Sequence, residues 1–206
     1  MVFFTGTVSK GSRVGKIIRR EGWGIVLVPE LLNKFSPLHF PLYFLDNGAF
    51  AYYQRGEEFK GELFMRALEI VAGVPVSPAF VVVPDKVAAG RESLEFSLWW
   101  FERLKREFPR FTYALVVQDG MEEGEVKKAV REFEVLFVGG SLEWKLKTGR
   151  RWVRLAHSLG IGRVGTESRL RWARWIGADS ADSSLPLFSR RKLRNVVENL
   201  RVGFLF

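Results

Sequence analysis

Residues 113–120 read YALVVQDG, a short apolar run that ends in a glutamine, an aspartate and a glycine. β-Branched and aromatic residues crowded into so few positions are typical of a buried strand. The stretches on either side, around residues 89–107 and 122–132, carry many charges and a helical periodicity. A strand between two helices predicts a β–α unit, in which successive strands pair in parallel because a helix crosses over between them.

The same alternation runs along the whole chain. Helix-like stretches lie around residues 59–72, 89–107, 122–132, 143–159, 167–176 and 188–201. Residues 30–42, with Pro37 and Pro41, read as a loop or insertion. Eight strands predict a compact TIM-type (β/α)8 barrel, whereas loss of the two weakest would leave an open doubly wound sheet. The predicted strands are MVFFTG (1–6), GIVLVP (24–29), LYFLDNG (42–48), FVVVPD (80–85), YALVVQDG (113–120), VLFVGG (135–140), RVGT (163–166) and GADSADS (177–183).

Composition bounds the size and the chemistry of the protein. A length of 206 residues with 47% hydrophobic content suits one well-packed domain, residues 1–206. Cysteine is absent, which excludes disulfides, thiol nucleophiles and cysteine-based zinc sites, and the two histidines, His39 and His157, argue against a histidine-rich metal centre. We therefore expect no metal and no cofactor. The apolar runs are far shorter than a membrane span, so we expect a soluble cytoplasmic protein without a membrane partner.

The net charge is +9 and the isoelectric point is about 10.0. Such a balance favours a polyanionic partner, above all a nucleic acid. The alternative is a solvated, heat-tolerant surface rich in Arg, Lys and Glu. Charge alone leaves both open.

Several predicted strands end in polar residues or bare glycine. In a barrel these ends share one face, where the loops after the strands form the active site. Taken singly, each is better explained as a loop start or a helix N-cap, but five in succession predict one convergent pocket. The residues concerned are Asp46, Asn47, Asp85, Gln118, Asp119, Gly139, Gly140, Asp179 and Asp182.

One segment carries a family resemblance. Residues 164–186, VGTESRLRWARWIGADSADSSLP, resemble the stretch of tRNA-guanine transglycosylases, and of their DNA-modifying relatives, that runs from a Val-Gly-Thr strand end to Gly-x-Asp-x-x-Asp and Leu-Pro. In that pattern the second acid is the nucleophile, which points to Asp182 and leaves Asp179 a supporting role. The resemblance spans roughly residues 41–191, and this last segment is its specific part.

The earlier strand ends are similar to the family's motifs in the same order. LDNGAF resembles Asp-Ser-Gly-Gly-Phe, which implies Asp46 as general acid/base and Phe50 as the ring that stacks on the base. Asp85 falls where the family has a base-reading aspartate, and Gln118 in VVQDG resembles a base-binding glutamine. VGGSLEWK resembles the segment whose backbone meets the heterocycle, here at Gly139 and Gly140.

The chain also departs from the family. It has none of the cysteines of the tRNA enzymes' zinc subdomain, so we expect the barrel without that subdomain. Asn47 and Ala49 replace a serine and a glycine, and Phe188 stands where an arginine is expected. The short zinc-free form looks more like the DNA-modifying branch of viruses and mobile elements than a tRNA enzyme.

The residue types suit base exchange at a nucleoside C1′. A carboxylate can hold the sugar covalently while one heterocycle leaves and another enters, which requires Asp182 to be ionised. A second carboxyl group must protonate the departing base, a role for Asp46 if its pocket raises its pKa. An aspartate, a glutamine and backbone amides match the edge of guanine or a 7-deazaguanine.

Cations near the predicted pocket would hold a nucleic-acid backbone, DNA or tRNA. Trp172 and Trp175, three residues apart on one predicted helix, are expected to pack in the core. Two other functions stay open: a nucleoside or glycoside hydrolase or transferase acting on small molecules, and a non-catalytic nucleic-acid-binding barrel, which could serve a protein partner subunit. The cations are Lys145, Lys147, Arg150, Arg151, Arg163, Arg190 and Arg191.

Overall fold

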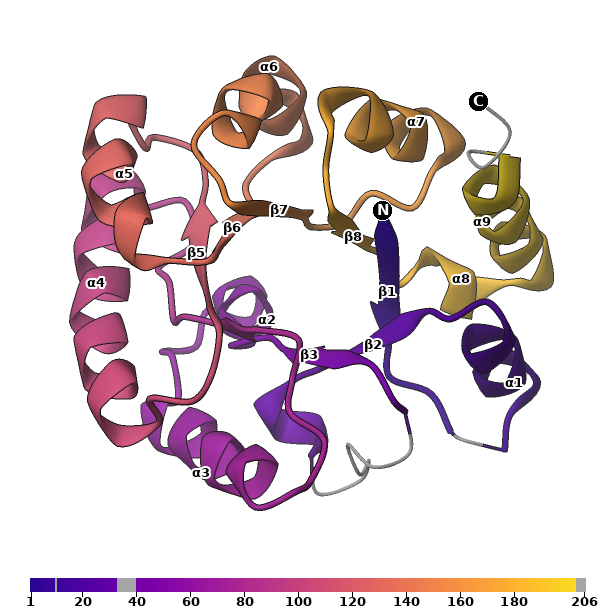
Figure 1. Cartoon of the computed structure of the whole chain (residues 1–206), viewed down its shortest axis with the longest axis horizontal. Coiled ribbons are helices and arrows are strands. Elements are labelled where there is room, and N and C mark those ends of the chain that lie inside the picture. The colour runs from indigo at the N-terminus through magenta and orange to yellow at the C-terminus, as the bar shows by residue number, and fades with distance from the viewer. Residues whose placement is uncertain (10, 33–39, 203–206) are drawn as a thin grey trace.

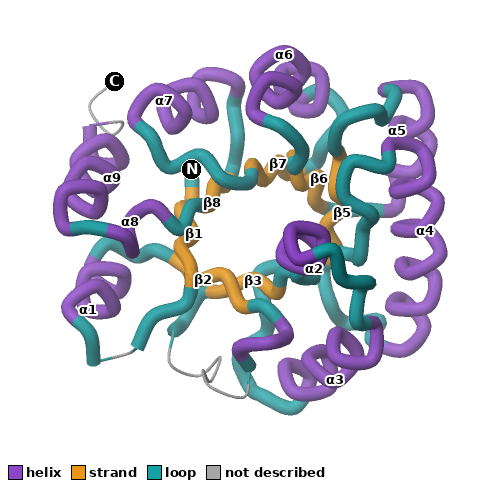
Figure 2. The backbone as a smooth tube through the Cα atoms, turned by 180° about the vertical axis from the view of Figure 1, so that it is seen from behind, coloured by secondary structure: helices purple, strands orange, loops and turns teal. Residues whose placement is uncertain are grey.

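Eight parallel strands close into a barrel with the helices outside it (Figures 1 and 2). The computed structural model describes residues 1–9, 11–32 and 40–202. Each strand pairs with the next, and β8 returns to β1 through the register Phe3–Ala181. The predicted (β/α)8 barrel is therefore confirmed. Its strands are β1 Val2–Gly6, β2 Gly24–Leu27, β3 Tyr43–Leu45, β4 Val81–Val82, β5 Tyr113–Val117, β6 Val135–Val138, β7 Ser158–Ile161 and β8 Ser180–Asp182.

The helices follow the strands in turn. Short 3₁₀ turns occur at Pro29–Leu31 and Val130–Glu132. Two helices early in the chain, α1 and α2, are additional to the predicted set, and the predicted loop at residues 30–42 lies partly outside the described residues. The helices are α1 Arg13–Arg20, α2 Ala49–Arg55, α3 Gly61–Ala72, α4 Gly90–Glu107, α5 Glu123–Ala129, α6 Leu142–Val153, α7 Glu167–Ile176, α8 Leu185–Phe188 and α9 Arg190–Val202.

The seventh strand differs from its prediction. It lies at residues 158–161, SLGI, rather than at 163–166, RVGT, and the preceding helix ends at Val153 rather than near residue 159. SLGI begins with a serine and has a glycine between its two apolar residues, so it lacks the β-branched run that marks the other strands. RVGT is instead the loop after β7, where the Val164 N–H donates to the Asp182 carbonyl at 2.9 Å.

Phenylalanine rings fill the inside of the barrel. Phe44 stacks on Phe80 with ring centroids 4.6 Å apart, and Phe4 meets Phe44 edge-on at 4.9 Å. Phe137 closes the group from β6, at 5.8 Å from Phe44. On β7, Gly160 leaves room for this ring, since a Cβ atom there would lie 2.9 Å from Phe137. The rings form a solid plug, so any cavity must lie above them, at the carboxyl ends of the strands.

A second apolar layer lies between the strands and the surrounding helices. It includes Phe64, Phe101, Leu136 and Trp152, all almost fully buried. Trp172 packs against this layer as expected, but the prediction for Trp175 is wrong: its side chain is 63% exposed, and Arg150 stacks on it.

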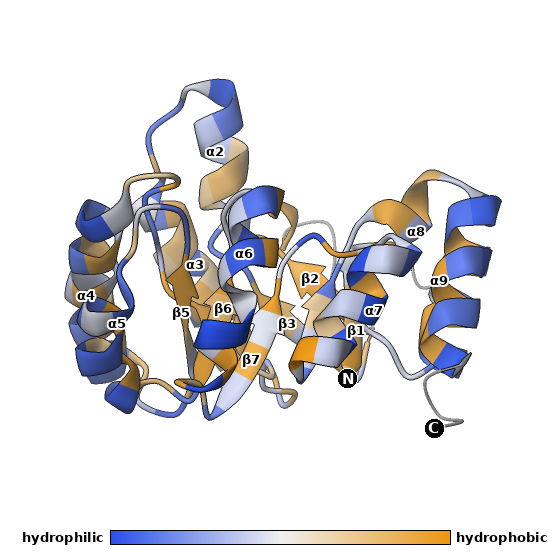
Figure 3. Cartoon of the chain, turned by 90° about the horizontal axis from the view of Figure 1, so that it is seen from above, coloured by the Kyte–Doolittle hydropathy of each residue, from blue (hydrophilic) through white to orange (hydrophobic). Residues whose placement is uncertain are grey.

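Helix α2 stands above the rest of the barrel in a side view (Figure 3). It follows β3 directly, so it rises from the face on which the strands end. Within the described part of the chain, none of the helices has the length and apolar character needed to cross a membrane.

Candidate functional site

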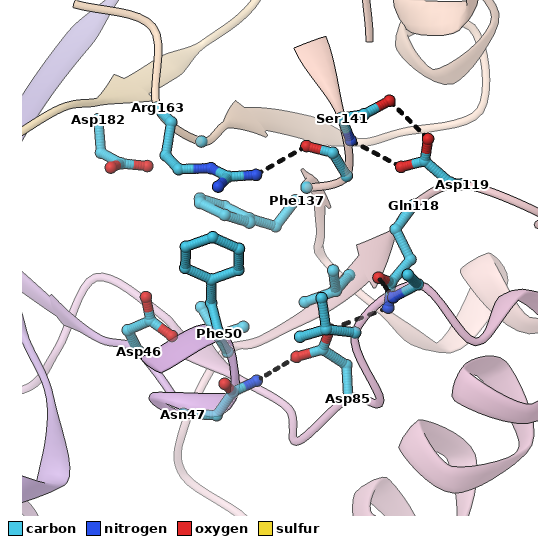
Figure 4. Close-up of a pocket in the computed structure, with 17 residues that line it drawn as sticks. Asp46, Asn47, Phe50, Asp85, Gln118, Asp119, Phe137, Ser141, Arg163 and Asp182 are labelled. Atoms are coloured by element: carbon cyan, nitrogen blue, oxygen red, sulfur yellow. Dashed lines mark hydrogen bonds between the residues drawn. The ribbon is translucent and has the colours of Figure 1, made fainter. Parts of the chain in front are cut away.

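A cavity of about 460 Å³ opens at the carboxyl ends of the strands, above the phenylalanine plug. Its wall is built by the ends of β3 to β8 and the first turn of α2. Phe137, Val82 and Val116 provide its apolar surface. Eight of the predicted site residues line it, and most are seen in Figure 4: Asp46, Phe50, Asp85, Gln118, Gly139, Gly140, Arg163 and Asp182.

Asp46 owes its position to a tight turn after β3. Its carboxylate accepts from the Gly48 N–H at 3.1 Å, and Gly48 adopts the left-handed conformation, φ 78°, that lets α2 begin at once. Burial raises the pKa of Asp46, although the backbone N–H groups of Gly48 and Asn47 favour the charged form. The turn after β3 thus holds the carboxylate that the family resemblance implies as the general acid/base.

Asp182 is the last residue of β8 and points into the cavity from the other side (Figure 4). Burial raises its pKa to about 7, and the charge of Asp46 adds to the effect. Lys145 and Arg163 act in the opposite direction. The charge of Asp46 therefore acts on the Asp182 carboxyl group across the cavity.

This electrostatic arrangement differs from the expected one. The chemistry called for one low and one raised pKa, but the pKa values of Asp46 and Asp182 are both raised. The physical reason is the apolar, desolvating cavity, which disfavours two negative charges together. Such a cavity favours a single negative charge on the two carboxyl groups over two.

Asp85 is held at the bottom of the cavity by two amide side chains. Asn47 Nδ2 donates to Asp85 Oδ1 at 2.8 Å, and Gln118 Nε2 donates to Asp85 Oδ2 at 2.9 Å. Burial raises the pKa of Asp85 to about 6 despite these donors. The two amides fix the plane of the carboxyl group.

Gln118 is consequently not free to bind a ligand as predicted. Its Nε2 also lies within 3.0 Å of Lys86 O and 2.8 Å of Ser93 Oγ, and its Oε1 accepts from the Ala88 N–H at 2.7 Å. Every polar atom of the amide is engaged, so its role in this structure is to orient Asp85. Asn47, seen from the sequence only as a departure from a motif, shares that role.

Gly139 and Gly140 differ in what their backbones offer. The Gly139 N–H donates to the Val117 carbonyl at 2.9 Å, within the sheet. Gly140 takes φ 73°, and a Cβ atom there would lie 2.3 Å from Asp119 Oδ2. Asp119 in turn accepts from Ser141 N–H and Oγ–H, both at 2.6 Å, which holds the start of α6. The Gly140 N–H makes no hydrogen bond to the other described residues and Gly140 lines the cavity, so this N–H is available as a donor to a ligand.

Arg163 and Phe50 meet at the mouth of the cavity. The Arg163 guanidinium lies 4.1 Å from the Phe50 ring centroid and donates to the Gly140 carbonyl at 2.8 Å. Arg163 takes φ 59°, as does Ala88 on the opposite wall, and no other non-glycine residue in the described ranges has a positive φ. Left-handed backbone at two non-glycine residues is strain, and it is concentrated at this cavity.

Lys145 does not lie where a contact with nucleic acid requires it. Its side chain is 2% exposed and its Nζ donates to the Gly162 carbonyl at 2.7 Å, beneath the cavity. Burial lowers its pKa to about 8, and the charge of Asp182 opposes this change. The prediction of a surface phosphate contact is corrected: Lys145 is a buried cation whose charge lowers the pKa of Asp182. The helical spacing of LEWKLKTGRRW, with Trp144, Thr148 and Trp152 on the inner side, was the available signal.

Arg190 and Arg191 lie apart from the cavity. They are exposed at the start of α9 and line a separate groove on the outside of the barrel. Asp179 also lies outside the cavity, where its carboxylate accepts from the Leu159 N–H at 2.8 Å and joins β8 to β7.

No cluster of three or more His, Cys, Asp or Glu side chains suited to a metal ion occurs in residues 1–9, 11–32 and 40–202. Neither a protein-family model nor a curated protein matches this chain. The function must therefore be argued from the cavity and from the motifs that form it.

Proposed function

We propose that this protein is a transglycosylase that exchanges guanine in a nucleic acid for a 7-deazaguanine base. One observation carries the proposal: two carboxyl groups with raised pKa values, Asp46 and Asp182, face a single cavity whose other wall presents Asp85 and the Gly140 N–H. Sequence motifs similar to those of the guanine transglycosylases supply these residues in the family's order.

In the proposed reaction an oxygen of Asp182 attacks C1′ as the bond from C1′ to the purine nitrogen breaks. The bonding electrons go to the purine, which takes the proton of Asp46. In the second half, Asp46 removes the ring proton of the incoming base, whose nitrogen attacks C1′ and releases Asp182. No proton or charge is lost, because Asp46 returns to its starting state.

The base is recognised by groups that keep hydrogen-bonding capacity, since each Asp85 oxygen accepts one amide hydrogen bond and retains a second lone pair. The Asp85 carboxyl, oriented by two amides, accepts from the N–H groups along the guanine edge, and the Gly140 N–H donates to its carbonyl. Adenine reverses these donors and acceptors and leaves them unpaired. The Phe50 and Phe137 rings provide the stacking surfaces seen in Figure 4.

The proposed substrate is a polymer, with DNA preferred over tRNA because these 206 residues contain none of the cysteines of the tRNA enzymes' zinc subdomain. A nucleotide must then leave its stack to reach the cavity, which costs a few kcal/mol in a duplex and less in a single strand. Arg163, exposed at the mouth, is the cation best placed to meet the flanking phosphate. Release of counterions makes such binding weaken steeply with salt.

The test is incorporation of radiolabelled guanine into duplex DNA, single-stranded DNA and unmodified tRNA. We expect label in one of these polymers, preferably DNA, and none with the isosteric variant Asp182→Asn. Asp179→Asn is the matched control, because it changes an aspartate three residues away whose side chain lies outside the cavity. It should retain incorporation if its fold is intact.

Label in no polymer, despite tight and salt-sensitive binding, would overturn catalysis and leave a binding protein. Release of base from free nucleosides, with little effect of salt, would favour a small-molecule hydrolase or transferase that uses the same two carboxyl groups.

A further inference from the structure

A groove of about 840 Å³ separates α1 from α9 on the outside of the barrel. Figures 1 and 2 both show these helices side by side at the edge of the molecule, with the short α8 between them. A bidentate ion pair bridges them at one end, where Arg201 lies 2.6 Å from Glu21. Helices of 8 and 13 residues give the groove walls of about 12 and 20 Å.

The floor of the groove is apolar. Val14 and Ile17 project from α1 at i, i+3 spacing, and Leu193 and Val197 project from α9 at i, i+4 spacing. Leu187 of α8 completes it. All except Leu193 are only half-buried, so the floor keeps apolar surface in contact with solvent. This spacing on two neighbouring helices is the seam against which a third helix packs.

The rim of the groove is cationic. Six arginines line it, against two carboxylates, Glu198 and the bridging Glu21, which leaves an excess of four positive charges. Neither α1 nor α9 has an acidic residue in its first turn, although a helix N-terminus favours one. The arginines are Arg13, Arg20, Arg190, Arg191, Arg194 and Arg201.

We propose that this groove binds an acidic amphipathic helix of a partner protein. Leucine-like side chains of such a helix would cover Val14, Ile17 and Val197, and its carboxylates would pair with the arginines on both sides. The partner helix should be of about 8 to 13 residues, the length of the two helices that form the walls.

A nucleic-acid backbone fits the groove less well. Phosphates would pair with the arginines, but they would gain no binding energy from the half-buried apolar floor of valine, isoleucine and leucine. The groove also lies on the outer wall between two barrel helices, apart from the cavity that would hold the flipped nucleotide. The apolar floor therefore distinguishes the two occupants.

The probe is a synthetic peptide of about 14 residues with leucines at i, i+3, i+4 and i+7 and glutamates at the other positions. Its control has the same composition with the leucines moved off this spacing. Binding is followed by fluorescence anisotropy, and the contact surface is mapped by amide chemical shifts of the ¹⁵N-labelled protein.

We expect a dissociation constant below about 100 μM and shifts confined to α1, α8 and α9. Val197→Gln and Arg194→Glu should each weaken binding at least about tenfold. The matched control is Lys16→Glu, which reverses a charge on α1 outside the groove. Circular dichroism verifies that each variant is folded.

Equal binding of the two peptides overturns the proposal. So does the absence of chemical-shift changes on these helices at a peptide concentration of about ten times the expected dissociation constant. So does displacement of the peptide by single-stranded DNA whose own binding is lost in Arg194→Glu but unchanged in Val197→Gln, since that pattern assigns the groove to phosphate. The result does not depend on base exchange, so the two proposals stand or fall separately.

Discussion

Replacement of Asp182 by asparagine should stabilise the protein at pH 8. The cavity desolvates this carboxyl group and places it near Asp46, so its ionised form is penalised in the folded state. Asparagine has nearly the same shape and carries no charge. A gain in stability on replacement is what we expect if Asp182 serves the proposed chemistry at a cost in stability.

The direction of the pH dependence follows from the raised pKa. Between pH 3.8 and about 7 the folded state binds a proton at Asp182 that the unfolded state has already released. The free energy of unfolding of the wild type therefore falls as the pH rises through this range. Asp182→Asn lacks this contribution, so its advantage should be largest above pH 7 and fade towards pH 4.

The size of the effect can be bounded. A pKa of about 7 in place of 3.8 corresponds to roughly 4 kcal/mol at about 1.4 kcal/mol per pKa unit. Asp182 lines an open cavity and is only half-buried, and the variant also deprives Lys145 and Arg163 of a counter-charge. Both facts reduce the gain, and we expect about 2 kcal/mol at pH 8.

The assay is urea denaturation of both proteins from pH 4 to pH 9. Asp119→Asn is the opposite control. Burial acts to raise the pKa of Asp119, but hydrogen bonds from Ser141 bring it below its ordinary value, so loss of this carboxylate should destabilise the protein at pH 8. An Asp182→Asn variant that is less stable than the wild type at pH 8, or whose advantage does not change with pH, would refute the reasoning.

Further substitutions test the surroundings of the cavity. Lys145→Met should raise the pKa of Asp182 above its value of about 7, because a buried positive charge is removed. The pKa is measured by NMR titration of the Asp182 ¹³Cγ resonance, which is identified by its absence from the spectrum of Asp182→Asn. Gly160→Ala should cost about 1–3 kcal/mol of stability, because its Cβ would lie 2.9 Å from Phe137 inside the plug. Gly124→Ala, in α5 and with nothing within 4 Å, should instead stabilise by about 0.5–1 kcal/mol, and equal effects of the two alanines in urea denaturation would contradict this account of the plug.

The sequence was most informative where the hydrophobic pattern was strong. β5, at residues 113–117, is a fully buried strand next to the polar Gln118. The alternation with helices was enough to place that residue at the carboxyl ends of the barrel strands, where the cavity lies. β7 was misplaced because SLGI has too few apolar residues to mark a strand, and it is defined by pairing with β6 and β8. Such pairing is set by the tertiary structure.

The roles of individual polar side chains were harder to predict. Nothing local tells that the Gln118 amide is fully occupied by Asp85, Ser93 and neighbouring backbone, since these partners are distant in the chain. Lys145 resembles the other cations of a basic chain, and only the inward side of α6, visible in its helical spacing, distinguishes it as buried. The raised pKa of Asp182 likewise depends on its burial and on the nearby charge of Asp46, and both follow from the three-dimensional structure.

The preference of the cavity for a single negative charge also fits the charge changes of the proposed reaction. Before attack, Asp182 is ionised and Asp46 carries a proton; in the covalent intermediate, Asp182 is an uncharged ester and Asp46 is ionised. The pair thus holds one negative charge at each stage, the state that a desolvating cavity with two raised pKa values favours. Across the pH range, base exchange should therefore follow a bell-shaped curve, falling on the acid side as both groups become protonated and on the alkaline side as both ionise. Initial rates of guanine incorporation across that range measure it, and a rate that rises steadily to pH 9 would show that Asp46 does not act as the acid.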